Sequence, residues 1–153
     1  MNKQEQLQTV RDILSGDRFA METGIVIDDF SEDGAVCHVD IGPSHCNLSK
    51  AVQGGVFFTL GDFCFAVASN AANLLGKTGY LAISLSSSIS FVKQPRGKRL
   101  IATAKKVSAG HKTCLYQIHI SDEMQTPCAE MLINGYTVKF ELPKAEAAYT
   151  ERE

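Results

Sequence analysis

Apolar residues recur at helical spacing near the start of the chain and again in one long central segment. Near the start they lie three or four positions apart, at Leu7, Val10, Ile13 and Leu14. This spacing predicts a short amphipathic helix, and residues 15–17 (Ser-Gly-Asp) end it. Residues from about 54 to 75 predict a long helix closed by Gly76. Because that segment is apolar around most of its circumference, we expect it in the middle of the core.

Outside the helices, the hydrophobic pattern changes to the alternation that is typical of strands. The segments that show it are 21–30, 35–41, 80–93, 99–108, 113–121 and 128–141. Short turn-like connections separate most of them, which favours antiparallel pairing. One curved sheet can cover one side of the long helix, and no second long helix is available for the other side. The pattern therefore predicts an α+β fold that associates with itself.

Composition is ordinary for a single globular domain. The chain has 153 residues, of which 44% are hydrophobic and 21% charged. This length supports one real core. We expect an N-terminal helix over residues 1–18, a single domain over 19–142 and a polar tail over 143–153.

Charge and cysteine content narrow the class of partner and the compartment. A formal net charge of -2 and the absence of tryptophan disfavour nucleic acid as a partner. The polar N-terminus lacks the apolar core of a signal peptide. The apolar region 56–68 contains Thr59, Gly61 and Asp62, so we expect no membrane span. Five cysteines with no CxxC spacing favour a reducing compartment, so we expect a cytoplasmic protein with no metal site.

The candidate chemistry lies in the segment 45–70. Gly54 and Gly55 stand where the long helix begins, and free backbone N–H groups at a helix start can stabilise an oxyanion. Asp62 follows among phenylalanines, where partial burial raises the basicity of a carboxylate. An oxyanion donor and a base in one stretch suggest acyl transfer. Both features also have purely structural explanations: the two glycines can form a tight turn, and Asp62 can lie on a solvated edge of the helix.

The spacing of these two groups indicates a site made by two chains. Asp62 lies eight residues beyond Gly54, or about 12 Å along a helix axis. One chain cannot easily bring both groups to the same carbonyl. Two antiparallel helices related by a two-fold axis can, because Asp62 of one then lies near Gly54 of the other.

Three short motifs with the spacing just described resemble those of a known enzyme family. They are His45-x-Asn47, Gln53-Gly54-Gly55 and Leu60-Gly61-Asp62. They are similar to the motif region of hotdog-fold acyl-CoA thioesterases of the PaaI type. The likeness continues through residues 65–70 and, more weakly, through 84–91 and the turn at 110–113. Together with the expected strand order, it covers about residues 20 to 140.

This resemblance implies a hotdog fold and an activity. The fold is a long helix wrapped by a curved antiparallel sheet of about six strands, and the activity is hydrolysis of an acyl-CoA thioester. The implied catalytic residues are Gly54 as oxyanion donor, Asp62 as base or nucleophile, Asn47 and Gln53. The implied substrate-binding residues are Gly55, Ser84, His111 and Lys112. Family members form dimers that pair into tetramers, so a homodimer or homotetramer without metal or cofactor is expected.

Gln53 departs from the family pattern, which usually has histidine at this position. Glutamine forms hydrogen bonds but carries no titrating proton near neutral pH. We interpret Gln53 as a residue that orients the carbonyl or the loop. Two alternatives stay open: a non-catalytic acyl-CoA-binding protein, and a hotdog hydratase or dehydratase acting on an enoyl or hydroxyacyl thioester.

Overall fold

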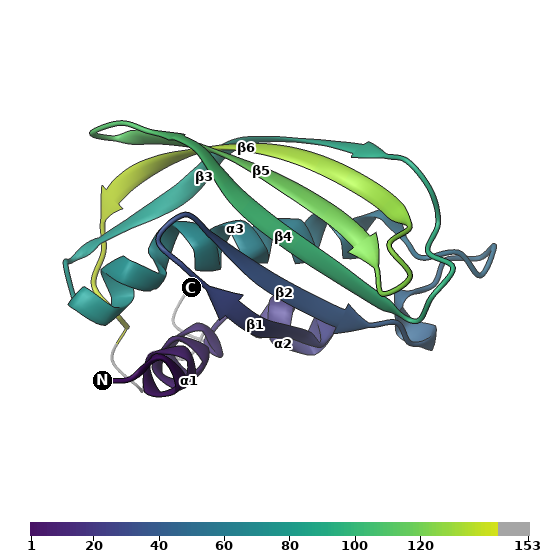
Figure 1. The fold of residues 1–153 in the computed structure, drawn as a ribbon, viewed down its shortest axis with the longest axis horizontal. Helices are drawn as coiled ribbons and strands as arrows, with labels where there is room; N and C mark the ends of the chain where they lie inside the picture. Colours follow the sequence, from purple (N-terminus) through teal and green to yellow (C-terminus); the bar gives the residue numbers. More distant parts are fainter. Residues whose placement is uncertain (144–153) are drawn as a thin grey trace, which may run out of the picture.

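The computed structural model describes residues 1–143 and shows one long helix wrapped by one curved sheet (Figure 1). The helices are α1 (Lys3–Leu14), α2 (Arg18–Thr23) and α3 (Gly54–Gly76), with a short 3-10 turn at Pro43–His45. The strands are β1 (Ile25–Phe30), β2 (Gly34–Asp40), β3 (Tyr80–Phe91), β4 (Arg99–Ala109), β5 (Thr113–Asp122) and β6 (Pro127–Lys139). The sheet order is β1-β2-β4-β5-β6-β3, and every neighbouring pair is antiparallel. The expected α+β architecture, the long helix and the six strands are confirmed. The expected tail over 143–153 lies almost wholly outside the described residues.

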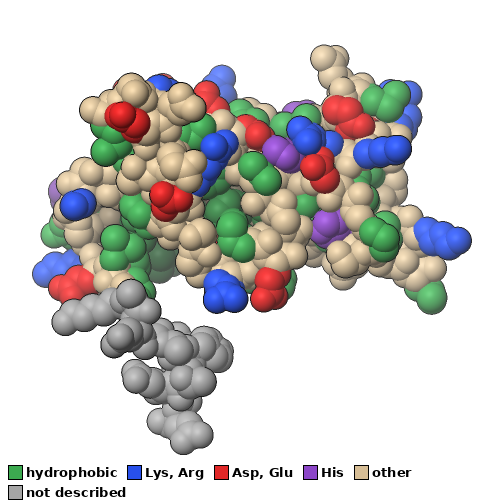
Figure 2. Space-filling view, turned by 90° about the horizontal axis from the view of Figure 1, so that it is seen from below, with side chains coloured by type: hydrophobic (Ala, Val, Ile, Leu, Met, Phe, Trp, Pro, Cys, Tyr) green, Lys and Arg blue, Asp and Glu red, His purple; other side chains and the backbone are tan. Residues whose placement is uncertain are grey.

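One expectation about the first strand was wrong. Residues 21–23 belong to α2, and β1 begins only at Ile25. The Asp17 side chain caps α2 by accepting the Ala20 N–H, and Gly24 ends the helix with φ +88°. An acidic N-cap and a left-handed glycine are ordinary helix signals, and here they outweigh the strand-like alternation. Figure 2 shows the face that carries α1 and α2, where acidic and basic side chains are interspersed.

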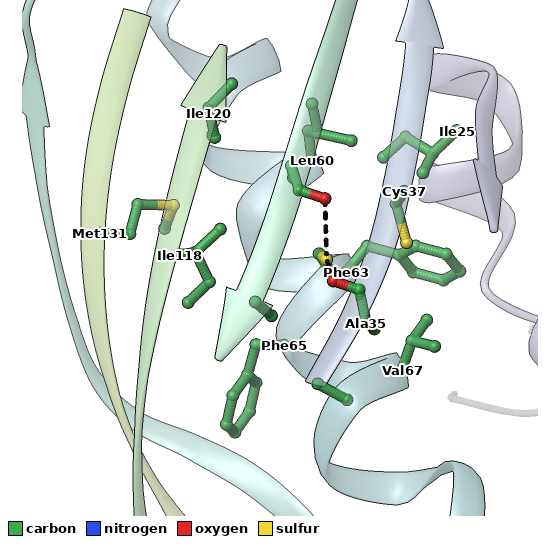
Figure 3. Packing of buried hydrophobic residues seen from close by; sticks show 14 of the residues in the cluster. Ile25, Ala35, Cys37, Leu60, Phe63, Phe65, Val67, Ile118, Ile120 and Met131 are labelled. Carbon is green, nitrogen blue, oxygen red and sulfur yellow. Dashed lines mark hydrogen bonds between the residues drawn. The ribbon is translucent and has the colours of Figure 1, made fainter. Parts of the chain in front are cut away.

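The core lies between α3 and the concave face of the sheet (Figure 3). Phe57, Leu60, Phe65 and Val67 of α3 are all at most 2% exposed. Gly61 lies against Met131 of β6, and a Cβ there would collide with the methionine sulfur. The glycine therefore lets the helix approach the sheet closely, which fixes the position of the residues on its next turn.

The environment of α3, not its composition, shows that it is a core helix. It has 23 residues and a mean hydropathy of 1.3 over its most apolar window, so its length and composition would allow it to cross a membrane. The polar residues within 56–68 were therefore not a sufficient argument against a membrane span, because the whole helix passes a test of length and composition. More than half of that window is buried inside the protein, where the sheet wraps it.

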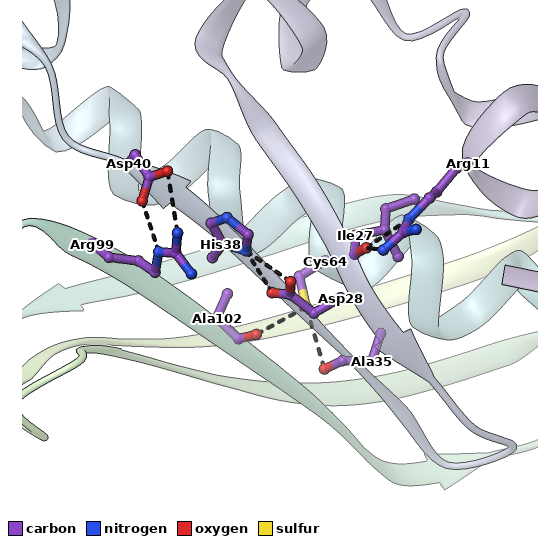
Figure 4. Close-up of polar contacts among 9 residues, drawn as sticks. All are labelled: Arg11, Ile27, Asp28, Ala35, His38, Asp40, Cys64, Arg99 and Ala102. Carbon is purple, nitrogen blue, oxygen red and sulfur yellow. Dashed lines mark hydrogen bonds and ion pairs between the residues drawn. The ribbon is translucent and has the colours of Figure 1, made fainter. Parts of the chain in front are cut away.

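The two edges of the sheet differ in how they are covered. At the β1 edge, the Arg11 guanidinium of α1 donates to the Ile27 carbonyl at 2.9 Å and 2.6 Å (Figure 4). Lys3 donates to the Phe30 carbonyl in the same way. At the opposite edge, β3 pairs only with β6, and its side chains Ile83 and Leu85 are 46% and 64% exposed. Side chains from α1 thus occupy one edge, while the other presents open backbone and apolar surface.

Candidate functional site

The loop before α3 folds on itself and sets the direction of the helix start. The Asn47 side-chain oxygen accepts the N–H groups of Ser49 and Ala51, at 2.9 Å and 3.2 Å. The Asn47 backbone N–H donates to the Ala51 carbonyl, and the Gln53 N–H donates to the His45 carbonyl. Asn47 is therefore a turn-forming residue that also lines the surface beside Gly54.

His45 connects this loop to α2. Its Nδ1 accepts the Gly42 N–H at 2.9 Å, so the ring proton sits on Nε2, which lies 2.6 Å from the Thr23 carbonyl oxygen. The imidazole thereby links the end of α2 to the loop in front of α3. His45, which opens the first motif, has a positioning role in this structure.

At the start of α3, the backbone donors of the two glycines have different surroundings. Gln53 is the N-cap residue, and its side-chain oxygen accepts the Gly55 N–H at 2.8 Å. The Gly54 N–H has no acceptor within residues 1–143. Gly54 is thus the donor that remains available to a ligand, at the positive end of a 23-residue helix. The structure also gives Gln53 a defined task, because it caps the helix that carries this donor.

Asp62 lies two turns further along α3 and is half-buried. Burial raises the pKa of its carboxyl above the ordinary aspartate value, and the negative charge of Asp17 adds to the increase. The Ser84 hydroxyl on β3 acts in the opposite direction by hydrogen bonding. The structure therefore brings Ser84, which sequence alone related only weakly to the site, next to Asp62. It also places Asp62 on the side of α3 that faces the open edge strand.

The aromatic surroundings of Asp62 are thinner than the sequence suggested. Phe63 and Phe65 are each 2% exposed and pack into the core, whereas Phe58 is 38% exposed on the surface of α3. Phe63 directly follows Asp62 and points to a different side of the helix, whereas Phe58 and Phe65, four residues before and three residues after Asp62, lie on adjoining parts of its face. Of the two buried rings, only that of Phe65 is therefore placed to contribute to the burial of Asp62.

His111 and Lys112 lie far from the start of α3. They line a hollow of about 700 Å³ at the other end of the helix, together with Asn73 and Tyr80. Because a helix of 23 residues is about 33 Å long, these side chains cannot reach the Gly54 N–H of their own chain. Within one chain, then, the structure joins Asn47, Gln53 and Gly54 at one place, Asp62 and Ser84 at a second, and His111 and Lys112 at a third.

Two hollows flank the first turn of α3, and both involve residues that sequence reasoning missed. One, of about 330 Å³, lies between α2 and α3 and has Phe19 in its wall. The other, of about 380 Å³, lies between α3 and the end of β3 and has Phe91 in its wall. The aromatic ring of Phe91 also approaches Gly54 closely enough that a Cβ there would lie 3.1 Å from it. Neither phenylalanine belongs to a motif, so only the fold reveals its position.

Comparison with known proteins identifies relatives that are named as esterases or thioesterases. Residues 50–129 match the family model described as the thioesterase superfamily. An Archaeoglobus fulgidus protein named as an esterase is 27% identical over 143 residues, covering 92% of this chain and 89% of its own. The acyl-coenzyme A thioesterase PaaI of Escherichia coli is 28% identical, covering 80% of this chain and 84% of its own.

Solved structures show the same fold. The structure of the E. coli PaaI protein, described as coming from the phenylacetic acid degradation operon, superimposes with a TM-score of 0.77 and 25% identity. It covers 89% of this chain and 95% of that one. The Haemophilus influenzae thioesterase HI1161 has a TM-score of 0.76 at 18% identity, with 92% and 94% of the two chains covered.

Proposed function

This chain belongs to the thioesterase superfamily, and from that premise we propose that it hydrolyses an acyl-CoA thioester to the free acid and CoA. The observation that carries the proposal is the Gly54 N–H at the start of α3, which has no partner among residues 1–143, with Asp62 two turns further along the same helix. A backbone donor aimed at a carbonyl and a carboxylate of raised pKa are the two groups that thioester hydrolysis needs.

In the proposed reaction, the Gly54 N–H donates to the thioester carbonyl oxygen. The positive end of the helix dipole favours the negative charge that develops on this oxygen. Asp62 accepts a proton from water, whose oxygen attacks the carbonyl carbon. The tetrahedral intermediate then collapses, the carbon–sulfur bond breaks, and CoA leaves as the thiolate, which takes up a proton. In the alternative route, Asp62 itself attacks and water hydrolyses the resulting anhydride.

We propose that two chains share the site. Ser84 lies on β3, the strand with the open edge, so Asp62 beside it lies near the surface that a second copy would cover. Exposed Ile83, Leu85 and Leu132 provide apolar contact there. Because side chains of α1 already occupy the β1 edge, the sheet can extend readily at one edge only, and a two-fold dimer results. Pairing of dimers gives the proposed homotetramer.

The remaining site residues receive supporting roles. Asn47 and Gln53 hold the loop and the helix start, so they orient the carbonyl relative to Gly54. Ser84 hydrogen-bonds Asp62 and keeps its carboxylate in place. His111 and Lys112 would contact the CoA portion of the substrate where it runs along the surface. The activity proposed here requires no metal or cofactor, and a cytoplasmic location fits an acyl-CoA substrate.

A thiol-release assay over acyl-CoA esters from short to long tests this function. We expect release of free CoA by the native protein, and loss of it in Asp62→Asn. Tight binding of acyl-CoA without thiol release would support a non-catalytic binding protein instead. Hydration of an enoyl-CoA without thiol release would support the hydratase.

A further inference from the structure

We infer that the hollow between the start of α3 and the end of β3 holds the acyl group of the substrate, with Phe91 as its specificity-determining residue. This inference rests on the proposed function, since it begins from a thioester carbonyl held at the Gly54 N–H. Gly54 itself lines this α3–β3 hollow, which has a volume of about 380 Å³. A carbonyl bound at Gly54 therefore has the hollow directly beside it, and the acyl chain attached to that carbonyl can enter it.

The lining of the α3–β3 hollow is mainly apolar. Five of its nine lining residues have apolar side chains, namely Val52, Phe57, Phe91, Val92 and Cys128. Lys93 is the one charged residue among them, and it is exposed. The hollow between α2 and α3 is lined mostly by polar residues, Glu22 and Gln53 among them, and does not include Gly54. A hydrocarbon chain attached to a carbonyl at Gly54 therefore fits the α3–β3 hollow better.

The Cys128 thiol belongs to this apolar wall and is not a nucleophile. Cys128 is 1% exposed, and its Sγ donates to the Thr126 carbonyl oxygen at 3.2 Å. Burial raises the pKa of the Cys128 thiol to about 11, so it stays protonated at neutral pH. Since the thiolate is the reactive form of cysteine, this side chain acts as a small hydrophobic group.

Phe91 presents an exposed aromatic ring beside the proposed oxyanion donor. It is 58% exposed, although its ring packs edge-on against that of buried Phe57, with the ring centroids 5.9 Å apart. The tip of the ring also faces Gly54, so a Cβ on Gly54 would lie 3.1 Å from the Phe91 Cζ. An acyl chain that covers the exposed part of this ring gains free energy, because apolar surface is removed from water. Phe91 is therefore placed to respond to the length of the chain.

Hydrogen bonds hold the segment at the end of β3 in place. The Val52 N–H donates to the Gln94 side-chain oxygen at 2.8 Å, and the Gln94 side-chain amide donates to the Val52 carbonyl at 3.2 Å. The N–H groups of Val92 and Lys93 both donate to the Cys128 carbonyl on β6. This segment is thus attached both to the loop before α3 and to β6, so the hollow is preformed.

The volume of the hollow limits the length of the acyl group. An apolar cavity of about 150 Å³ holds one benzene, or roughly 25 Å³ per carbon. On that scale, about 380 Å³ holds at most about fifteen carbons. An eight-carbon acyl group fits, whereas an eighteen-carbon group would extend into solvent. The hollow therefore selects short to medium acyl chains.

Binding of ketone analogues of acyl-CoA tests the assignment without requiring turnover. In these analogues a methylene separates sulfur from the carbonyl, so they cannot be hydrolysed. We expect Phe91→Ala to weaken binding of the octanoyl analogue roughly tenfold by calorimetry and to leave binding of the acetyl analogue unchanged. Phe19→Ala is the matched control and should change neither affinity, because Phe19 is also an exposed phenylalanine but lies in the wall of the other hollow.

A second variant on the same wall guards against a folding defect in Phe91→Ala. Val92 is 52% exposed, and its hydrogen bond to Cys128 comes from the backbone, so Val92→Ser should preserve the fold. We expect this change to weaken the octanoyl analogue about threefold and to leave the acetyl analogue unchanged.

Three results would overturn the inference. The first is equal binding of the octanoyl analogue by Phe91→Ala, Val92→Ser and the native protein. The second is weaker binding in Phe19→Ala alone, which would place the acyl group between α2 and α3. The third is equal weakening of both analogues by Phe91→Ala, which would place the ring against the CoA portion or, where sedimentation also shows loss of dimer, against a second copy of the chain. Absence of thiol release by the native protein would refute the hydrolase alone, since the binding comparison can still be made.

Discussion

At the scale of single residues, the ionised carboxylate of Asp62 has opposite effects on stability and on the proposed activity. Burial and the nearby Asp17 raise its pKa, so the ionised form is less favourable in the folded protein than in the unfolded chain. Above the pKa of the unfolded chain, this carboxylate therefore lowers the free energy of unfolding, and the penalty disappears as the pH falls. The same ionised form is the one that can accept a proton from water.

From this conflict we predict that Asp62→Asn raises Tm at neutral pH while lowering kcat by roughly 10²-fold or more. The native kcat/KM should fall as the pH drops through the raised pKa, so the acidic limb lies above the ordinary aspartate range. Calorimetry and pH-rate profiles measure both effects. Native turnover in the mutant would instead leave Asp62 as a solvated residue at the helix edge.

Gln53 is the second residue whose role can be tested. Its side chain caps α3 through the Gly55 N–H, and substitution of such a cap costs about 1 kcal/mol of stability. We predict that Gln53→Ala lowers kcat/KM by no more than roughly tenfold, and that Gln53→His is tolerated. Steady-state kinetics with thermal melts separate the two effects. If Gln53→His increases activity by orders of magnitude, the native chain is a binding protein.

Sequence alone predicted that the long helix begins at Gly54 and contains Asp62, and the structure confirms this placement, because helix period and helix-start glycines are local signals. It could not show that Gly55 is already bonded to Gln53, since that depends on a side-chain rotamer. Nor could it show that Phe19 faces a hollow, because the ring borders residues that are more than thirty positions away along the chain. Contacts of this kind arise only when the loops are folded.

At the scale of elements, α1 holds the β1 edge through charged side chains. Arg11 donates two hydrogen bonds to the Ile27 carbonyl, and Lys3 also pairs with Asp29 at 3.1 Å. Hydrogen bonds from a charged donor are each worth roughly 1.5 to 3 kcal/mol. The N-terminal helix is thus attached by its polar face as well as by buried Val10.

We therefore predict that Arg11→Ala lowers the free energy of unfolding by about 1.5 to 3 kcal/mol and speeds amide exchange in α1 and β1. Lys105→Ala, at an exposed position on β4, is the control and should change neither quantity. If amide exchange accelerated equally in every strand of the sheet, Arg11 would stabilise the fold as a whole and not the contact between α1 and β1 in particular.

Element boundaries show where sequence patterns lose their predictive power. The long helix was placed correctly because its apolar pattern spans six turns and ends at Gly76. Helix α2 was missed because its six residues are too few to establish a period, and the apolar residues that follow extended the strand pattern backwards. In such short segments, the cap at Asp17 is the more reliable signal.

At the scale of the whole molecule, the proposed dimer forms through the open β3 edge. We predict that the native protein sediments as a dimer or larger species at sub-micromolar concentration. Leu85→Lys places a charge on a side chain that is 64% exposed in the single chain, so it should leave the fold intact and weaken association. In this variant, activity should fall in proportion to the fraction of dimer. Met124→Lys, the control, should leave both association and activity unchanged. A monomer with full activity would refute the shared site.

The shared site makes a stricter prediction about mixtures of two inactive variants. Proline is well accommodated at the first position of a helix, so Gly54→Pro removes the N–H donor while preserving the start of α3. Its added ring atoms require a small shift of Phe91, whose side chain is largely exposed. If Gly54 of one chain acts with Asp62 of the other, a mixed dimer of Gly54→Pro and Asp62→Asn contains one site with both defects and one with neither.

Random reassociation of equal amounts makes half of the dimers mixed, so about a quarter of the native activity should return. The measurement is thiol release after the two variants are unfolded together and refolded, compared with each variant treated alone. The separate refolded variants control for misfolding, and sedimentation confirms that mixed dimers form. If both groups act within one chain, every site in the mixture retains one defect and no activity returns. This outcome, together with an intact dimer, would reject the two-chain site while leaving the thioesterase fold unaffected.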